Sequence, residues 1–173
     1  MAIRTILEAP DPRLRVKSEP VAAVDDGIRA LIADMFDTMY DAPGIGLAAV
    51  QIGVPKRVLV IDLQEEGEGR RNPRVFINPE LYQPDAELSV YNEGCLSVPE
   101  QYAEVERPKT VRARWLDENG VQHDEHLDGL LATCLQHEMD HLEGILFIDH
   151  LSKLKRGMLL KKLQKAQKLR RAA

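Results

Sequence analysis

The sequence predicts an α+β fold, because its strand-like segments are not separated by regular helices. Three segments are rich in β-branched and aromatic residues, and strands are expected at residues 56–63, 74–81 and 110–117. The charged, glycine-bearing stretch 64–73 should form a loop between the first two strands. No repeat or linker divides the 173 residues, so we expect one domain spanning residues 1–173.

Helical periodicity defines two segments that flank these strands. Asp25 and Asp26 can cap a first helix, which should end near Ala42-Pro43-Gly44. The apolar residues of this helix are Ile28, Leu31, Ile32, Met35 and Met39. Asp128 can cap a second helix that ends at Gly144.

The composition excludes disordered and membrane-spanning classes of protein. Hydrophobic residues make up 44% of the chain, yet no stretch of about eighteen apolar residues appears. The first residues, MAIRTILEAPDPRLR, lack the apolar core of a signal peptide, so a cytoplasmic location is expected. In that compartment Cys95 and Cys134 are expected to be thiols or metal ligands rather than a disulfide.

The second helix carries His137, Glu138 and His141 in the spacing H-E-x-x-H. Two histidines four residues apart share one face of a helix, so both imidazoles can reach one metal ion. A glutamate beside the first histidine can then act on a water at that metal. The pattern is short and also occurs by chance in helices that carry two histidines near their surface.

A catalytic metal site usually has three protein ligands, and the helix supplies only two. A metzincin would place a third histidine where this chain has Phe147, and the carboxylates after His141 are too close to it for other zincin types. Cys134 lies seven residues before His141, about 10.5 Å along the helix axis, which is too far for a shared metal. Cys134 is better interpreted as a small apolar residue under the helix.

An upstream donor remains, and Cys95 in YNEGCLSVP (91–99) is the candidate. This stretch has the character of a loop, and Gly94 would let its backbone come close to a metal. The competing donors are His123, His126 and His150, of which the first two sit in a polar stretch typical of a surface hairpin. Cys95, His137 and His141 would give two nitrogens and one thiolate with one position open for water.

The stretch GIGLAAVQ (44–51) imitates a dinucleotide-binding fingerprint, with Gly44, Gly46 and Ala49 in place and Asp62 downstream. Its context argues against that function. A strand should precede the glycines, but a helical pattern does, and glycine and proline soon interrupt the helix that should follow.

Together these motifs resemble those of the peptide deformylase family. The three motifs are GIGLAAVQ (44–51), EGCLS (93–97) and QHEMDHL (136–142), in matching order and spacing. The similarity extends to residues 6–15 near the start and to LFIDHLSKLKR (146–156) near the end. The resemblance implies mixed or antiparallel β-sheets around a central metal-binding H-E-x-x-H helix, with a C-terminal helix. It also implies removal of the formyl group from the N-terminal formylmethionine of new polypeptides, releasing formate. The alternative is a general H-E-x-x-H metallopeptidase or amidase.

The resemblance also implies roles for individual residues. Glu138 would move protons between water and the leaving amine, while the Gln51 side-chain amide and the Leu96 backbone N–H would stabilise the oxyanion. The residues expected to bind substrate are Ile45, Gly46, Tyr91, Glu93, Leu130 and Cys134. The implied cofactor is Fe²⁺, although two nitrogens and a thiolate would also hold Zn²⁺, Ni²⁺ or Co²⁺.

Three more residues have open interpretations. Tyr102 stands where some relatives carry a basic residue near the substrate peptide. Arg107 and Asp140 can support the metal ligands as a pair, or they can form an ordinary surface ion pair.

The C-terminal segment carries a strong positive charge. From residue 152 to 173 there are nine Lys and Arg and no acidic residue, so the other 151 residues carry a net charge of −14. A helix is expected over 151–171, with an apolar stripe formed by Leu151, Leu154, Met158, Leu159, Leu163 and Ala166. We expect its basic side chains to dock on the ribosome, whereas a solvated helix face is the simpler alternative.

Overall fold

The computed structural model describes residues 2–64 and 71–173, so most of the loop expected at 64–73 lies outside the described residues. A five-stranded antiparallel sheet has the order β1-β2-β3-β6-β7, and β4 and β5 pair separately as an antiparallel hairpin. The strands are β1 (Gly46–Ala48), β2 (Val58–Ile61), β3 (Arg74–Tyr82), β4 (Leu88–Cys95), β5 (Val98–Pro108), β6 (Val111–Leu116) and β7 (Gln122–Leu127). The α+β prediction is confirmed, and β2, β3 and β6 lie within about two residues of the predicted strands.

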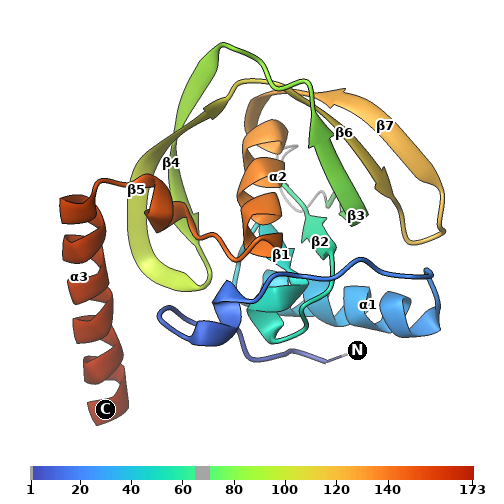
Figure 1. The fold of residues 1–173 in the computed structure, drawn as a ribbon. Coiled ribbons are helices and arrows are strands. Elements are labelled where there is room, and N and C mark those ends of the chain that lie inside the picture. The colour runs from blue at the N-terminus through green and yellow to red at the C-terminus, as the bar shows by residue number, and fades with distance from the viewer. Residues whose placement is uncertain (1, 65–70) are drawn as a thin grey trace.

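In the described part of the chain, three α-helices accompany the sheets: α1 (Asp26–Asp41), α2 (Gly129–Leu142) and α3 (Lys153–Ala172). Short 3-10 helices occupy η1 (Pro12–Arg15), η2 (Ala49–Ile52) and η3 (Phe147–His150). Helix α2 runs through the centre, with the β4–β5 hairpin on one side and the five-stranded sheet on the other, while α1 crosses below (Figure 1).

Strand β2 explains why helices cover both faces of the large sheet. Val58 and Val60 face a core cluster that includes α1, and Leu59 and Ile61 face a second cluster that includes α2. All four side chains are fully buried, as expected for an uninterrupted apolar run covered on two sides. This arrangement fixes α2 against the sheet and so positions the H-E-x-x-H residues.

The residues predicted to begin and end the helices are confirmed in part. Asp25 accepts a hydrogen bond from the Ile28 N–H and caps α1 as expected. Asp128 occupies the cap position of α2, but its side chain makes no capping hydrogen bond, which corrects the predicted cap. Gly144 follows α2 with φ of +75°, and a Cβ there would lie 2.5 Å from the Arg15 carbonyl oxygen. Glycine therefore ends this helix for both conformational and steric reasons.

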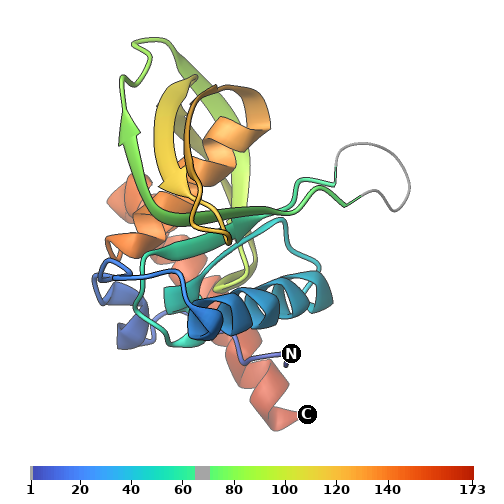
Figure 2. The same ribbon diagram turned by 90° about the vertical axis from the view of Figure 1, so that its right-hand side faces the viewer.

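Helix α3 packs beside β5 through Leu159 and Leu163, which are buried in a third cluster with residues such as Leu7 and Val98. The predicted helix is confirmed, but the predicted apolar stripe is only half correct. Leu154 and Met158 are 74% and 54% exposed, because the buried face follows Leu159 and Leu163. The C-terminal end of α3 projects beyond the rest of the molecule in both views (Figures 1 and 2).

Within the described residues, no helix is both long enough and apolar enough to cross a lipid bilayer.

Candidate active site

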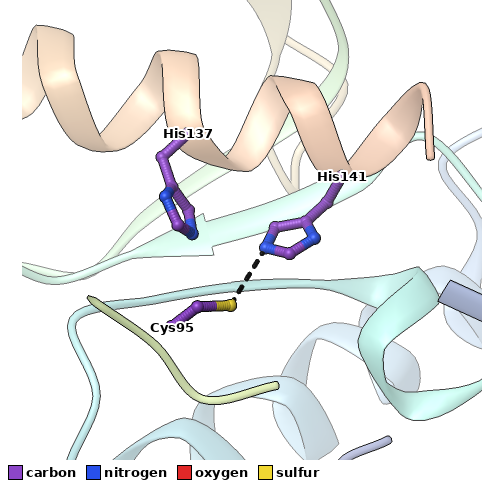
Figure 3. A group of neighbouring side chains, drawn as sticks. All are labelled: Cys95, His137 and His141. Atoms are coloured by element: carbon purple, nitrogen blue, oxygen red, sulfur yellow. Dashed lines mark hydrogen bonds between the residues drawn. The ribbon is translucent and has the colours of Figure 1, made fainter. Parts of the chain in front are cut away.

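The structure brings Cys95, His137 and His141 together between β4 and α2 (Figure 3). Their potential ligand atoms all lie within 4.8 Å of one another, and the Cys95 Sγ lies 3.4 Å from the His141 Nε2. Cys95 is the last residue of β4, rather than part of a loop as expected, and the two histidines are one turn apart on α2.

The chemistry of these donors suits a metal ion. Two imidazoles and a thiolate form a common three-ligand set that leaves one coordination position for water or substrate. Burial lowers the pKa of His141 well below its ordinary value, which keeps its imidazole neutral and able to bind a metal.

The competing donors lie elsewhere. His123 contacts Asp117 and stacks on Trp115, and His150 contacts Asp140. His126 lies on β7, and Cys134 does not join the cluster. Among the described residues, this is the single group of at least three such side chains close enough to share an ion.

Glu138 lies beside the cluster and is only 4% exposed. Its Oε1 is 4.0 Å from the His137 Nε2, and its Oε2 has no hydrogen-bond partner among the described residues. Burial raises the pKa of Glu138 to about 7. A Cβ at Gly46 would lie 2.8 Å from the Glu138 Oε1, so the glycine makes room for this carboxylate. A carboxylate of this kind can accept and release a proton near neutral pH.

A buried ion-pair network orients His137. The His137 Nδ1 lies 2.9 Å from the Glu93 carboxylate, which receives two hydrogen bonds from the Arg107 guanidinium. Burial alone would raise the pKa of Glu93, but the hydrogen bonds from His137 and Arg107 lower it below its usual range. Arg107 also donates to Asp140 at 2.9 Å, and because Arg107 is buried and Asp140 is partly buried, this is not an ordinary surface ion pair. A carboxylate on the far nitrogen of a histidine fixes its tautomer and the direction of its other nitrogen.

Gln51, at the end of GIGLAAVQ, lies in η2 with only 1% of its surface exposed. Its Oε1 accepts a hydrogen bond from the Ala48 N–H at 2.9 Å. Its Nε2 lies 3.5 Å from the Cys95 Sγ and donates to the Ser97 Oγ at 2.9 Å. The amide nitrogen of Gln51 therefore faces the candidate metal ligands.

A cleft of about 830 Å³ opens beside these residues. The predicted substrate-binding residues Ile45, Gly46, Tyr91, Glu93, Leu130 and Cys134 all line it, as does Leu96. The Glu93 carboxylate is nevertheless engaged by His137 and Arg107. Tyr102 also lines the cleft, is 66% exposed, and lies so close to Gly94 that a Cβ there would be 2.5 Å from its ring. Gly94 thus gives room to an aromatic ring, whereas the sequence suggested room for a metal.

Comparisons with known proteins identify the family. The model for polypeptide deformylase matches residues 3–157. The chain belongs to the polypeptide deformylase family. A peptide deformylase of Rhizorhabdus wittichii is 77% identical over the full length of both chains, and one of Zymomonas mobilis is 67% identical over 98% of each. A solved peptide deformylase structure from Legionella pneumophila has a TM-score of 0.92, with 46% identity over 99% of each chain.

Family membership confirms the predicted class of reaction. Peptide deformylases are metal-dependent hydrolases that remove the N-terminal formyl group from nascent polypeptides, and this chain is such a hydrolase. The general metallopeptidase alternative is set aside.

The sequence analysis predicted neither of two contacts in the site. The Ser97 hydroxyl accepts a hydrogen bond from the Gln51 amide, and Arg107 donates to the Glu93 carboxylate. The sequence offered two weak signals. Ser97 is a small polar residue two positions after Cys95, and Arg107 is a basic residue on the strand that follows Cys95.

Proposed function

We propose that Cys95, His137 and His141 hold the catalytic metal and that Glu138 is the general base and acid. The observation that carries this proposal is a Glu138 carboxylate oxygen that has no hydrogen-bond partner among the described residues and lies beside three donor atoms, which are within 4.8 Å of one another. When bound, the metal would polarise the formyl group and acidify a coordinated water. Glu138 would take up the water's proton and pass it to the leaving amine.

Gln51 and Leu96 are proposed to stabilise the charge that develops on the formyl oxygen. The Gln51 Nε2 already faces Cys95, and one N–H remains beyond the N–H that binds Ser97. The Leu96 backbone N–H follows directly after the proposed cysteine ligand. A single donor of this kind contributes on the order of 10²–10³ in rate.

The cleft is proposed to bind the formylmethionine and the peptide that follows it. Ile45, Leu130 and Cys134, with Tyr91, offer an apolar wall suited to an unbranched thioether. Strand β1 lies at the edge of the sheet, so the Gly46 backbone can pair with the peptide main chain.

Fe²⁺ is proposed as the resident metal. The resemblance to deformylases favours ferrous iron, and the donor set would also accept Zn²⁺, Ni²⁺ or Co²⁺. Apo-protein should be reconstituted with each of these metals under argon and in air, and formate release from a formylmethionyl peptide measured. We expect highest activity with Fe²⁺ and rapid loss of that activity in air, because a thiolate on a redox-active metal is open to oxidation. Full, air-stable activity confined to the zinc form would contradict the iron assignment.

The ribosome is proposed as the partner of α3, which would place the enzyme in the cytoplasm where its substrates emerge. Support comes from the nine basic residues after residue 151 and from the projection of the helix end (Figures 1 and 2). Arg170 is not among the free charges, because it forms an ion pair with Glu8 at 2.7 Å. The exposed basic side chains that remain are Lys153, Lys155, Lys161, Lys162, Lys165, Lys168 and Arg171.

A further inference from the structure

We propose that Ser97 is a positioning residue, which holds the Gln51 side-chain amide in the orientation needed to stabilise the formyl oxygen. The proposal rests on the role of Gln51 proposed above. The Ser97 hydroxyl makes no described hydrogen bond to a candidate metal ligand. Its partner is the side-chain amide of Gln51, through which it acts.

The orientation of the Gln51 amide is defined by its partners. The Ala48 backbone N–H can only donate, so the atom it binds must be the amide oxygen Oε1. The nitrogen Nε2 then has to point in the opposite direction, toward Cys95 and Ser97. The hydrogen-bond network itself therefore excludes the flipped amide.

The hydroxyl of Ser97 determines the direction in which each of the two N–H groups of the Gln51 amide points. One N–H donates to the Ser97 Oγ at 2.9 Å, which leaves the other on the side of the Cys95 sulfur, 3.5 Å from the nitrogen. Gln51 and Ser97 are 1% and 0% exposed, so bulk water cannot take the place of the hydroxyl. Without that acceptor, the amide loses one of the two anchors that set its rotation.

The position of Ser97 is fixed independently of its side chain. The Ala9 N–H donates to the Ser97 carbonyl oxygen, and the Leu7 N–H donates to the Gln51 carbonyl oxygen, each at 2.8 Å. The segment from Leu7 to Ala9 thus joins the main chains of the two residues. Replacing the hydroxyl should leave this backbone arrangement in place and alter only the amide.

A double-mutant cycle tests the proposal. Formate release and metal content should be measured for Ser97→Ala, Gln51→Ala and the double variant. We expect Ser97→Ala to lower kcat on the order of 10-fold with little change in KM, since oxyanion donors act in the transition state. In the Gln51→Ala background, the serine substitution should have no further effect, because the group it positions is gone. A serine with a merely structural role would reduce activity by the same factor in both backgrounds.

Ser18 provides a matched control. It is 3% exposed, and its hydroxyl has no hydrogen-bond partner among the described residues, so Ser18→Ala makes the same chemical change in a buried site. Its kcat should equal that of the parent. If Ser97→Ala proves too unstable to assay, Ser97→Cys keeps the size of the side chain and offers only a weak acceptor. It should show the same loss of kcat at unchanged metal content.

The outcomes separate the two proposals. A normal rate for Gln51→Ala would overturn the role of Gln51 and the positioning role of Ser97 with it. A slow Gln51→Ala variant combined with additive effects would overturn the role of Ser97 alone. Loss of metal from Ser97→Ala and Ser97→Cys would also overturn it, because the serine would then support the ligands rather than the amide.

Discussion

At the scale of single residues, neighbouring side chains on α2 differ in how far their hydrogen bonding is satisfied. His137 has its far nitrogen on Glu93, which is held in turn by Arg107, so its direction is fixed. Glu138, the next residue, keeps one buried carboxylate oxygen without a partner among the described residues. A satisfied histidine suits a ligand and an unsatisfied carboxylate suits a group that exchanges protons, so burial and hydrogen bonding support the two proposed roles.

We expect Glu138→Gln to retain its metal and to lose most turnover. The amide cannot accept the water's proton, and such acid–base help is typically worth roughly 10²–10⁴-fold in rate. Metal content and formate release should be measured on the same preparation. Glu143→Gln is the control, since Glu143 lies at the end of the same helix and pairs with Lys17 and Arg57 at the surface. Near-normal release by metal-loaded Glu138→Gln would show that another group moves the proton.

Cys95→Ala should weaken metal binding far more than Cys134→Ala. The Cys95 sulfur lies in the donor cluster, whereas Cys134 lines the cleft and packs against the core. Purified variants should be compared by metal content after dialysis against a weak chelator. Equal retention in both would mean that the wrong sulfur has been assigned, while Cys134→Ala should instead alter KM for formylmethionyl peptides.

At this scale, long-range contacts could be predicted only where a recognisable motif marked them. Helix geometry predicted that His137 and His141 share one face, and the resemblance of the motifs predicted that Cys95, 46 residues from His141, joins them. Ser97 and Gln51 are 46 residues apart, and Arg107 and Asp140 are 33 apart. Contacts of this kind depend on how β4 and β5 turn back over α2, which no local pattern specifies.

At the scale of elements, the strongest patterns gave the most accurate predictions. Helix α1 and strands β2, β3 and β6 combine clear periodicity or β-branched runs with burial against a core. Strands β1, β4 and β5 were missed, and β7 was expected only as part of a surface hairpin. Strand β1 has only three residues, and β4 exposes Leu88 and Val90 because the hairpin has an open face. Pairing with β2 and β5 stabilises these strands, and pairing partners are not visible in a local window.

Two substitutions on helix α3 test which of its faces packs against the rest of the molecule. Leu163→Ala should lower the free energy of unfolding by about 2–5 kcal/mol, because its fully buried side chain would leave a cavity in the third cluster. Leu154→Ala on the same helix should change it by less than about 0.5 kcal/mol, since its side chain is 74% exposed. Urea unfolding of both variants gives the comparison, and equal effects would contradict the observed packing.

At the scale of the whole molecule, charge is separated between the body and α3. The first 151 residues carry a net charge of −14, so nucleic acid would repel the body and only α3 can supply attraction. Truncation after Leu151 would remove this charge, but it would also remove Leu159 and Leu163 from the core. Charge reversal at exposed positions therefore separates docking from folding more cleanly.

We expect Lys161→Glu, Lys165→Glu and Lys168→Glu, combined in one variant, to abolish binding to ribosomes and leave turnover of a short formyl peptide intact. These lysines are exposed on α3 and do not line the cleft. If about three phosphates are neutralised by the parent, its log–log salt slope should be roughly −2 to −3. Its affinity would then fall roughly 20- to 50-fold between 50 and 200 mM salt by the same relation.

The control for this variant reverses Lys17, Lys56 and Lys109, which changes the net charge by the same amount on the body. Two of these lysines form exposed ion pairs, with Glu143 and Glu87, and such pairs contribute little to stability. Co-sedimentation with ribosomes at several salt concentrations should find the control bound nearly as well as the parent and the α3 variant in the supernatant. If α3 is only a solvated helix, neither the parent nor the control will pellet. Equal loss in both variants would show that net charge, rather than the helix, governs the association.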